Sequence, residues 1–129
     1  MAHLGPVARW ELFWADLNPS VGSEQGGESR PVLILSNDGF NAQFPLVTVL
    51  PCTKLEGKKR RVYSFEVLLQ KGLVTAAHDS ILMPQQIRTI SKTRLLSRIG
   101  AITDAAIQAE IENRVLEHLG ISFEAEFSG

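Results

Sequence analysis

The sequence predicts a mainly β protein with helices (α+β), in which a small, strongly curved, mostly antiparallel sheet or barrel carries a C-terminal helix. Short segments with strand-like composition follow one another, separated by residues that favour turns. Near the C-terminus, apolar residues recur every four positions, as on the buried side of an amphipathic helix. At 129 residues, the chain is expected to form a single domain with its core over about residues 10–120.

Several segments have the composition of β-strands. They are residues 10–17, 31–35, 46–50, 62–68 and 80–83, with further extended pieces at 86–90 and 99–102. The run 31–35 is almost continuously apolar, which predicts a central strand buried on both faces. Because Pro51 has no N–H to donate, we expect it to interrupt the strand before it, with Cys52 and Thr53 at the exit.

Three polar segments predict the starts of helices. Residues 36–38 cap a helical turn through residue 44, and Ser91 caps a short helix through residue 95. Thr103 caps a longer helix that runs to Leu119. The predicted buried side of that helix consists of Ile107, Ile111, Val115 and Leu119.

Composition limits the function classes. The formal net charge is −1, so any nucleic-acid site must be a local basic surface. The single cysteine excludes an internal disulfide and suits a reducing cytoplasm. No apolar run reaches the roughly 20 residues of a membrane span, and no signal peptide is visible. Zinc-type spacing of Cys and His is also absent, so we expect no metal and no cofactor.

The most informative stretch is GSEQGGESRPVLILSND, residues 22–38, where a polar loop runs into an apolar strand. Arg30 lies at the junction, and Pro31 keeps it extended. The planar guanidinium can face a phosphate there with its fork of N–H donors. The loop also gathers donors, acceptors and a charge, at Ser23, Glu24 and Gln25.

The sequence resembles the MazF/PemK family of toxin endoribonucleases (mRNA interferases) in WADLNP (14–19), this loop, TVLPCT (48–53), DSILMPQQIRTI (79–90) and the C-terminal helix. The resemblance implies an SH3-like β-barrel that works as a homodimer. It also implies sequence-specific, metal-independent cleavage of single-stranded mRNA, in which 2′-OH attack leaves a 2′,3′-cyclic phosphate and a 5′-OH end. The partner it implies is the cognate antitoxin of a type II toxin–antitoxin system, whose acidic, partly disordered tail covers the RNA groove.

The resemblance also implies site residues. Arg30 matches the family arginine that acts on the scissile phosphate, with proton transfer as a second role; the electrostatic role is favoured because arginine stays protonated. Thr53 matches the family threonine, whose hydroxyl holds a phosphate oxygen or relays a proton, although a strand-end threonine also bonds its own backbone. Glu24 could accept a proton or orient Arg30, and Ser23 and Gln25 could bind a phosphate or a base.

The chain departs from the family pattern in three places, one of which is the first strand, where Trp10 and Glu11 replace the usual Gly-Asp. The loop has one residue more than expected, at Glu28 and Ser29, which could shift the guanidinium by about 3.3 Å unless the extra residue bulges out. Some family members carry an arginine and an aspartate as acid–base pair where this chain has Met83 and Gln85. The identity of the general base therefore stays open.

RNA contacts are expected from the basic segment 54–61, from Gln86 and from Arg88. In the basic segment, the candidates are Lys54, Lys58, Lys59, Arg60 and Arg61, although a solvated hairpin tip explains them at least as well. Gln86 could contact a base edge or the RNA backbone, and Arg88 could contact RNA or form an ion pair.

Nucleases often use imidazole, but we expect the three histidines, His3, His78 and His118, to be ordinary surface residues. Two other functions stay open beside RNA cleavage. One is a gyrase-poisoning toxin of the CcdB type, and the other is a barrel that only binds RNA or protein.

Overall fold

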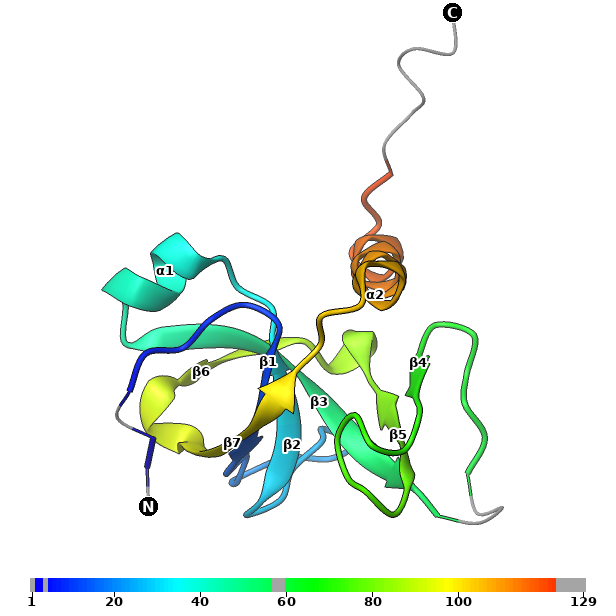
Figure 1. Ribbon diagram of the computed structural model, residues 1–129, viewed down its shortest axis with the longest axis horizontal. Coiled ribbons are helices and arrows are strands. Elements are labelled where there is room, and N and C mark those ends of the chain that lie inside the picture. Colours follow the sequence, from blue (N-terminus) through cyan, green and yellow to red (C-terminus); the bar gives the residue numbers. More distant parts are fainter. Residues whose placement is uncertain (1, 4, 57–59, 123–129) are drawn as a thin grey trace, which may run out of the picture.

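The computed structural model describes residues 2–3, 5–56 and 60–122, and in these ranges a twisted, mostly antiparallel sheet carries a helix across one face (Figure 1). The elements are β1 Glu11–Ala15, β2 Arg30–Ile34, α1 Asp38–Gln43, β3 Leu46–Leu55, β4 Val67–Leu69, β5 Asp79–Leu82, η1 Pro84–Gln86, β6 Arg88–Ser91, η2 Lys92–Arg94, β7 Leu95–Ala101 and α2 Ala105–His118. The strand order is β4-β5-β3-β2-β1-β7, and β6 pairs with β3. The predicted fold class is confirmed, but the described strands leave the sheet unclosed, so the barrel is a loose one.

The core follows the alternation of the strands. In β2, Val32 and Ile34 enter one apolar cluster while Leu33 enters the other, so this strand is buried on both faces, as predicted. The cluster around Leu33 is closed by α2, which contributes Ile111 and Val115. The strand that begins with Arg30 is therefore held rigidly from both sides, which fixes the base of its side chain.

The prediction that Pro51 interrupts its strand is wrong, because β3 runs through Pro51 to Leu55. On one side of β3, the pairing changes at this point, from β6 over Leu46–Val49 to β5 over Cys52–Leu55. A missing N–H costs little where the ladder changes partners. The Pro51 carbonyl still accepts from the Met83 N–H at 3.0 Å. As a result, Thr53 lies within a regular strand, not at its exit.

The helical caps are partly as predicted. Asn37 caps α1 and Ser91 caps η2. The cap of α2 is Asp104 and not Thr103, since its carboxylate accepts from Ala106 N–H at 2.8 Å and from Ile107 N–H at 3.1 Å. Along α2, Ile111 and Val115 are buried as expected.

Other element boundaries differ from the prediction. Leu119 is 51% exposed, because α2 ends at His118 and the apolar contact ends with Val115. The strand predicted over 62–68 is confined to β4, since a turn between Tyr63 and Glu66 occupies the residues before it. The strand predicted over 99–102 is β7, which starts earlier, at Leu95. No helix in the described ranges combines the length and the apolar character needed to cross a membrane.

Candidate active site

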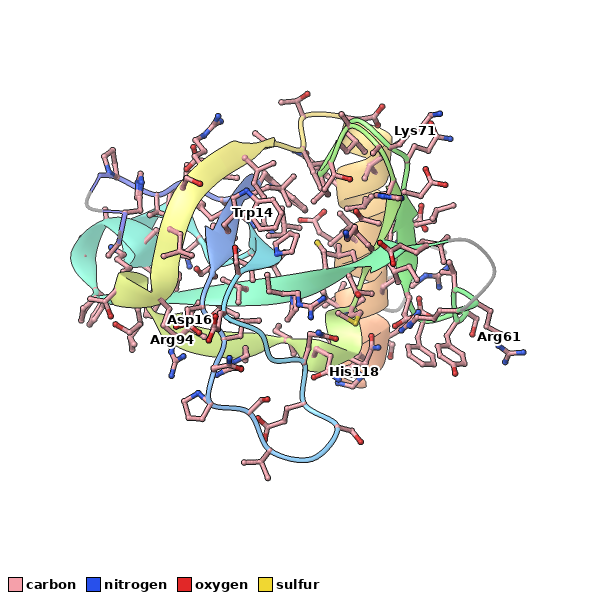
Figure 2. The ribbon with its side chains drawn as sticks, turned by 90° about the horizontal axis from the view of Figure 1, so that it is seen from below. Trp14, Asp16, Arg61, Lys71, Arg94 and His118 are labelled. Atoms are coloured by element: carbon pink, nitrogen blue, oxygen red, sulfur yellow. The ribbon has the colours of Figure 1, made fainter. Side chains whose placement is uncertain are left out.

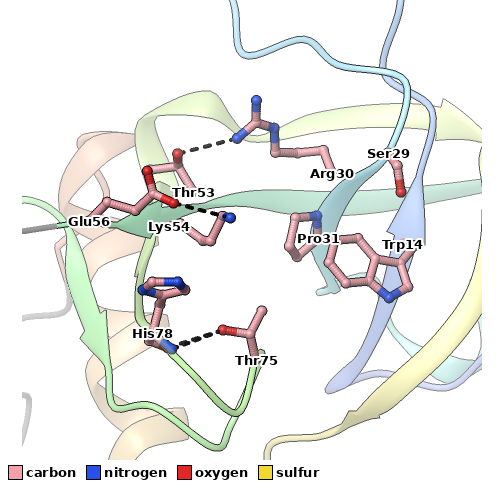
Figure 3. Close-up of a pocket in the computed structure, with 9 residues that line it drawn as sticks. All are labelled: Trp14, Ser29, Arg30, Pro31, Thr53, Lys54, Glu56, Thr75 and His78. Atoms are coloured by element: carbon pink, nitrogen blue, oxygen red, sulfur yellow. Dashed lines mark hydrogen bonds and ion pairs between the residues drawn. The ribbon is translucent and has the colours of Figure 1, made fainter.

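A pocket of about 490 Å³ opens beside the start of β2 and the end of β3 (Figure 3). Its volume is in the range of pockets that bind small ligands or parts of larger ones. The pocket is lined by Trp14, Ser29, Arg30, Pro31, Thr53, Lys54, Glu56, Thr75 and His78. The two residues of the sequence that matched a catalytic pattern, Arg30 and Thr53, therefore share one cavity.

Arg30 is fixed by several hydrogen bonds. Its Nη1 donates to Thr53 Oγ1 at 3.2 Å, and its Nε donates to the Gly26 carbonyl at 3.1 Å. The Gln25 amide is oriented with its side-chain oxygen toward Arg30, because only then do its atoms face suitable partners. That oxygen accepts from Arg30 Nη2 at 3.0 Å and from Arg30 Nε at 3.1 Å. The extra loop residue has not separated the guanidinium from Thr53. A planar cation held in advance is suited to stabilise a phosphate whose charge increases during reaction.

The loop that holds Arg30 is itself held by Gln86. The Gln86 Oε1 accepts from the Gln25 N–H at 3.1 Å, and its Nε2 donates to the Ser23 carbonyl at 3.2 Å. At the base of the same loop, Arg88 Nη1 reaches the Leu17 carbonyl at 3.4 Å. Both predicted RNA contacts, Gln86 and Arg88, thus make bonds to loop backbone, a positioning role that sequence reasoning missed.

Glu24 does not occupy the place expected for it. It is exposed and lines a second pocket of about 320 Å³ together with Gln25, Gln85, Gln86, Ile87 and Arg88. Among the described residues, the side-chain partners of Arg30 are Gln25 and Thr53. The expectation that Glu24 orients Arg30 is therefore wrong, because the neighbouring Gln25 does so.

Gly27 allows the loop to approach Arg30. Its φ is +129°, a conformation that side chains disfavour, and an added Cβ would lie 3.4 Å from Arg30 Nε and Nη2. We expect Gly27→Ala to lower the free energy of unfolding by about 1–3 kcal/mol and to lower activity, since backbone strain would be relieved by moving the loop. Urea denaturation measures the first effect. Gly22→Asn is the control, because Gly22 has φ +58° and open space, which asparagine tolerates; an equal loss in both variants would contradict the expectation.

Cys52 precedes Thr53 and is fully buried. Burial raises the pKa of its thiol to about 12, and the nearby Arg30 charge lowers it by less. The thiol therefore stays protonated and cannot act as a nucleophile.

We expect Cys52 to resist iodoacetamide at pH 8 in the native protein and to react once guanidinium chloride unfolds the chain. Mass spectrometry of the alkylated protein measures both states. Rapid alkylation of the folded protein, with loss of activity, would show that the thiol is accessible after all.

The basic side chains of residues 54–61 differ in their positions and partners. Lys54 lines the pocket and pairs with Glu56 at 3.2 Å, whereas Lys58 and Lys59 lie outside the described residues. Arg60 donates two hydrogen bonds to the buried Glu66 carboxylate, at 2.9 and 2.8 Å, so its guanidinium has a structural role here. Arg61 is exposed and points outward (Figure 2).

His78 is the clearest difference from the sequence analysis. It is half-buried and lines the same pocket as Arg30 and Thr53, so the expectation of an ordinary surface histidine is wrong for this residue. The cause is strand register: β3 and β5 pair with Leu55 opposite Asp79, so His78 lies beside the end of β3. Only knowledge of that long-range pairing could have found it.

Comparison with known proteins shows the family of this chain. A family model described as the PemK-like, MazF-like toxin of type II toxin–antitoxin systems matches residues 8–119. The chain belongs to this family. It is similar to Endoribonuclease MazF of Staphylococcus epidermidis, with 33% identity over 116 residues, covering 90% of this chain and 93% of that one.

Solved structures show the same fold. Deinococcus radiodurans MazF matches with a TM-score of 0.73 and 26% identity, covering 91% of this chain and 99% of that one. An endoribonuclease from mycobacterial species, solved in complex with its cognate antitoxin, matches with a TM-score of 0.71 and 20% identity, covering 91% and 98%. The open, twisted sheet with its C-terminal helix is therefore the architecture of MazF toxins.

Proposed function

We propose that this toxin endoribonuclease cleaves single-stranded RNA without a metal ion, and that Arg30 and Thr53 hold the scissile phosphate. The observation that carries the proposal is the bond from Arg30 Nη1 to Thr53 Oγ1, 3.2 Å long, on the wall of an open pocket. Of the functions that the sequence left open, family membership favours RNA cleavage over gyrase poisoning or simple binding.

The chemistry needs no nucleophile from the protein. The 2′-hydroxyl of the RNA attacks phosphorus, and the 5′-oxygen leaves, which gives a 2′,3′-cyclic phosphate and a 5′-OH end. Charge grows on the phosphate oxygens during this step, and donors fixed beforehand lower its barrier. Arg30 supplies a forked cation and Thr53 a hydroxyl, both anchored to strands that the core holds from two sides.

The pocket also offers surfaces for the rest of the RNA strand. Trp14 and Pro31 form an apolar part of the wall, and indole rings stack on unpaired bases. Lys54 adds a positive charge next to Thr53, beside the carboxylate of Glu56. Sequence preference would come from such base contacts, and affinity from the cations.

Cleavage of a long unstructured RNA in EDTA tests the proposal. We expect cleavage in EDTA, 5′-OH ends, and no reaction with a substrate that has a single 2′-deoxy nucleotide at the cleavage point. The ends are read by phosphorylation with polynucleotide kinase without prior phosphatase treatment. Strict dependence on Mg²⁺, or cleavage of the deoxy substrate, would contradict the mechanism.

We further propose that the protein works as a cytoplasmic homodimer and is inhibited by a cognate antitoxin with an acidic, partly disordered tail. The antitoxin is supported by the solved mycobacterial endoribonuclease, which is described in complex with its own antitoxin. A tail of this kind would fold onto the cations of the pocket and exclude RNA. Light scattering at micromolar concentration tests the dimer, and an active monomer would contradict it.

A further inference from the structure

We propose that His78 is the proton donor of the cleavage reaction: its imidazolium protonates the 5′-oxygen as that oxygen leaves phosphorus. The inference rests on the proposed RNA cleavage and adds a catalytic residue to it.

The first support is the placement of the ring. His78 lines the pocket that contains Arg30 and Thr53. In Figure 3, the His78 ring lies below the Lys54–Glu56 pair, on the opposite side of the pocket from Arg30. A phosphate held by Arg30 and Thr53 would therefore lie in the same pocket as His78, which faces it from another wall. Attack and departure take place on opposite sides of phosphorus, so a proton donor must lie apart from the groups that hold the phosphate.

The second support is that the backbone of His78 is anchored while its ring is not. The His78 N–H donates to Thr75 Oγ1 at 3.3 Å, and the Thr75 hydroxyl donates to the His78 carbonyl at 3.2 Å. The imidazole itself makes no hydrogen bond with any residue of the described ranges. Both ring nitrogens are thus able to meet a substrate.

The third support is the chemistry of the other residues in the pocket. A guanidinium does not give up its proton in proteins, so Arg30 is not the acid. The Lys54 ammonium is engaged with Glu56 at 3.2 Å, and a carboxylate accepts protons near neutral pH. Histidine is the side chain that exchanges a proton in this range. It is the best suited of the pocket residues to donate one.

Charged groups of both signs lie around His78. Arg30 and Lys54 bring positive charge to the pocket, Glu56 brings negative charge, and the adjoining Asp79 carboxylate accepts from the Lys71 N–H at 2.7 Å. A bound phosphodiester adds a negative charge close to the ring. This charge and the imidazolium attract each other, so bound RNA would draw the ring toward the phosphate.

Two bonds to phosphorus change in this step. The bond from the 2′-oxygen to phosphorus forms, and the 2′-hydroxyl proton passes to water. The bond from phosphorus to the 5′-oxygen breaks, and the imidazolium proton moves to that oxygen, giving a 5′-hydroxyl and neutral imidazole. The imidazole then regains a proton from water, so no other reactant is needed.

The experiment compares two leaving groups in one RNA whose cleavage point has been mapped with the wild-type protein. The ordinary oligonucleotide has a 5′-oxygen at that point, and the second has a bridging 5′-sulfur, which leaves as a thiolate without needing a proton. We expect His78→Gln to cleave the oxygen substrate about 10²-fold more slowly than wild type, but the sulfur substrate within about 5-fold. Both substrates report on the same folded fraction, so partial misfolding cannot imitate this ratio.

His118→Gln is the matched control, because His118 is exposed at the end of α2 and is not among the residues that line the pocket. It should match wild type on both substrates. Equal losses on both substrates, or no loss, would overturn the role of His78 while leaving RNA cleavage intact. Failure of the wild type to cleave would instead overturn the proposed function.

Discussion

Arg30→Ala is expected to lower the rate of RNA cleavage by about 10²–10³-fold while leaving the fold intact. The variant removes the cation that bonds Thr53, Gly26 and Gln25 at the pocket wall. Arg30→Lys should also be poor, because an ammonium lacks the planar fork that meets two phosphate oxygens. Initial rates on a fluorogenic RNA measure the loss, and circular dichroism checks the fold.

A control arginine and a pair of Thr53 variants test whether the loss is specific to the pocket. Arg98→Ala removes a half-exposed arginine that pairs with Glu11 away from the pocket, so its activity should equal that of wild type. At the second site residue, Thr53→Val should lose activity while Thr53→Ser keeps it, since only the hydroxyl meets Arg30. Near-normal cleavage by Arg30→Ala would mean that the phosphate is held elsewhere.

The parts of the fold and of the site that could be predicted are those that depend on residues close together in the sequence. The apolar run after Pro31 predicted a strand buried on both sides, and the proline predicted an extended Arg30 at its start. The Asn37 and Ser91 caps depend on contacts within three residues, so the sequence contains them in full.

The parts that could not be predicted depend on pairing between distant segments. Pro51 is tolerated in β3 because β6 pairs with the strand before this residue and β5 pairs with it afterwards. Neither pairing can be predicted from the residues near Pro51. Gln86 reaches a loop more than sixty residues away. His78 enters the pocket through the register of β3 with β5. Histidine in a turn is common, so only the fold distinguishes this one.

Breaking the ion pair between Arg60 and Glu66 is expected to have a large effect on the stability of the protein. The Glu66 side chain is 0% exposed and that of Arg60 is 33% exposed. The carboxylate also accepts from Gln85 Nε2 at 2.6 Å and from the Tyr63 N–H at 3.1 Å. A buried carboxylate without such partners is destabilising, so removal of the Arg60 cation should lower the free energy of unfolding.

We expect Arg60→Met to lower the free energy of unfolding by roughly 2 kcal/mol at pH 7. This is below the usual cost of breaking a buried pair, because Gln85 and the Tyr63 N–H remain and Arg60 is partly exposed. Arg61→Met is the control, since Arg61 also lies over the Tyr63 ring, at 5.1 Å, but no ion pair to Glu66 is found for it among the described residues. Urea denaturation of the two variants and the wild type measures the difference.

The pH dependence of this difference follows from Glu66. Burial acts to raise the pKa of Glu66, but the bonds from Arg60, Gln85 and the Tyr63 N–H outweigh it and hold the pKa below its ordinary value of 4.5. A carboxyl whose pKa is lowered by folding stabilises the native state above its unfolded pKa, and that contribution is lost as the pH falls through the folded pKa. The gap in stability between wild type and Arg60→Met should therefore be full at pH 7 and shrink below about pH 4.5. A gap of equal size at pH 3 and pH 7 would mean that Arg60 stabilises the protein by packing against Tyr63 and not by its charge.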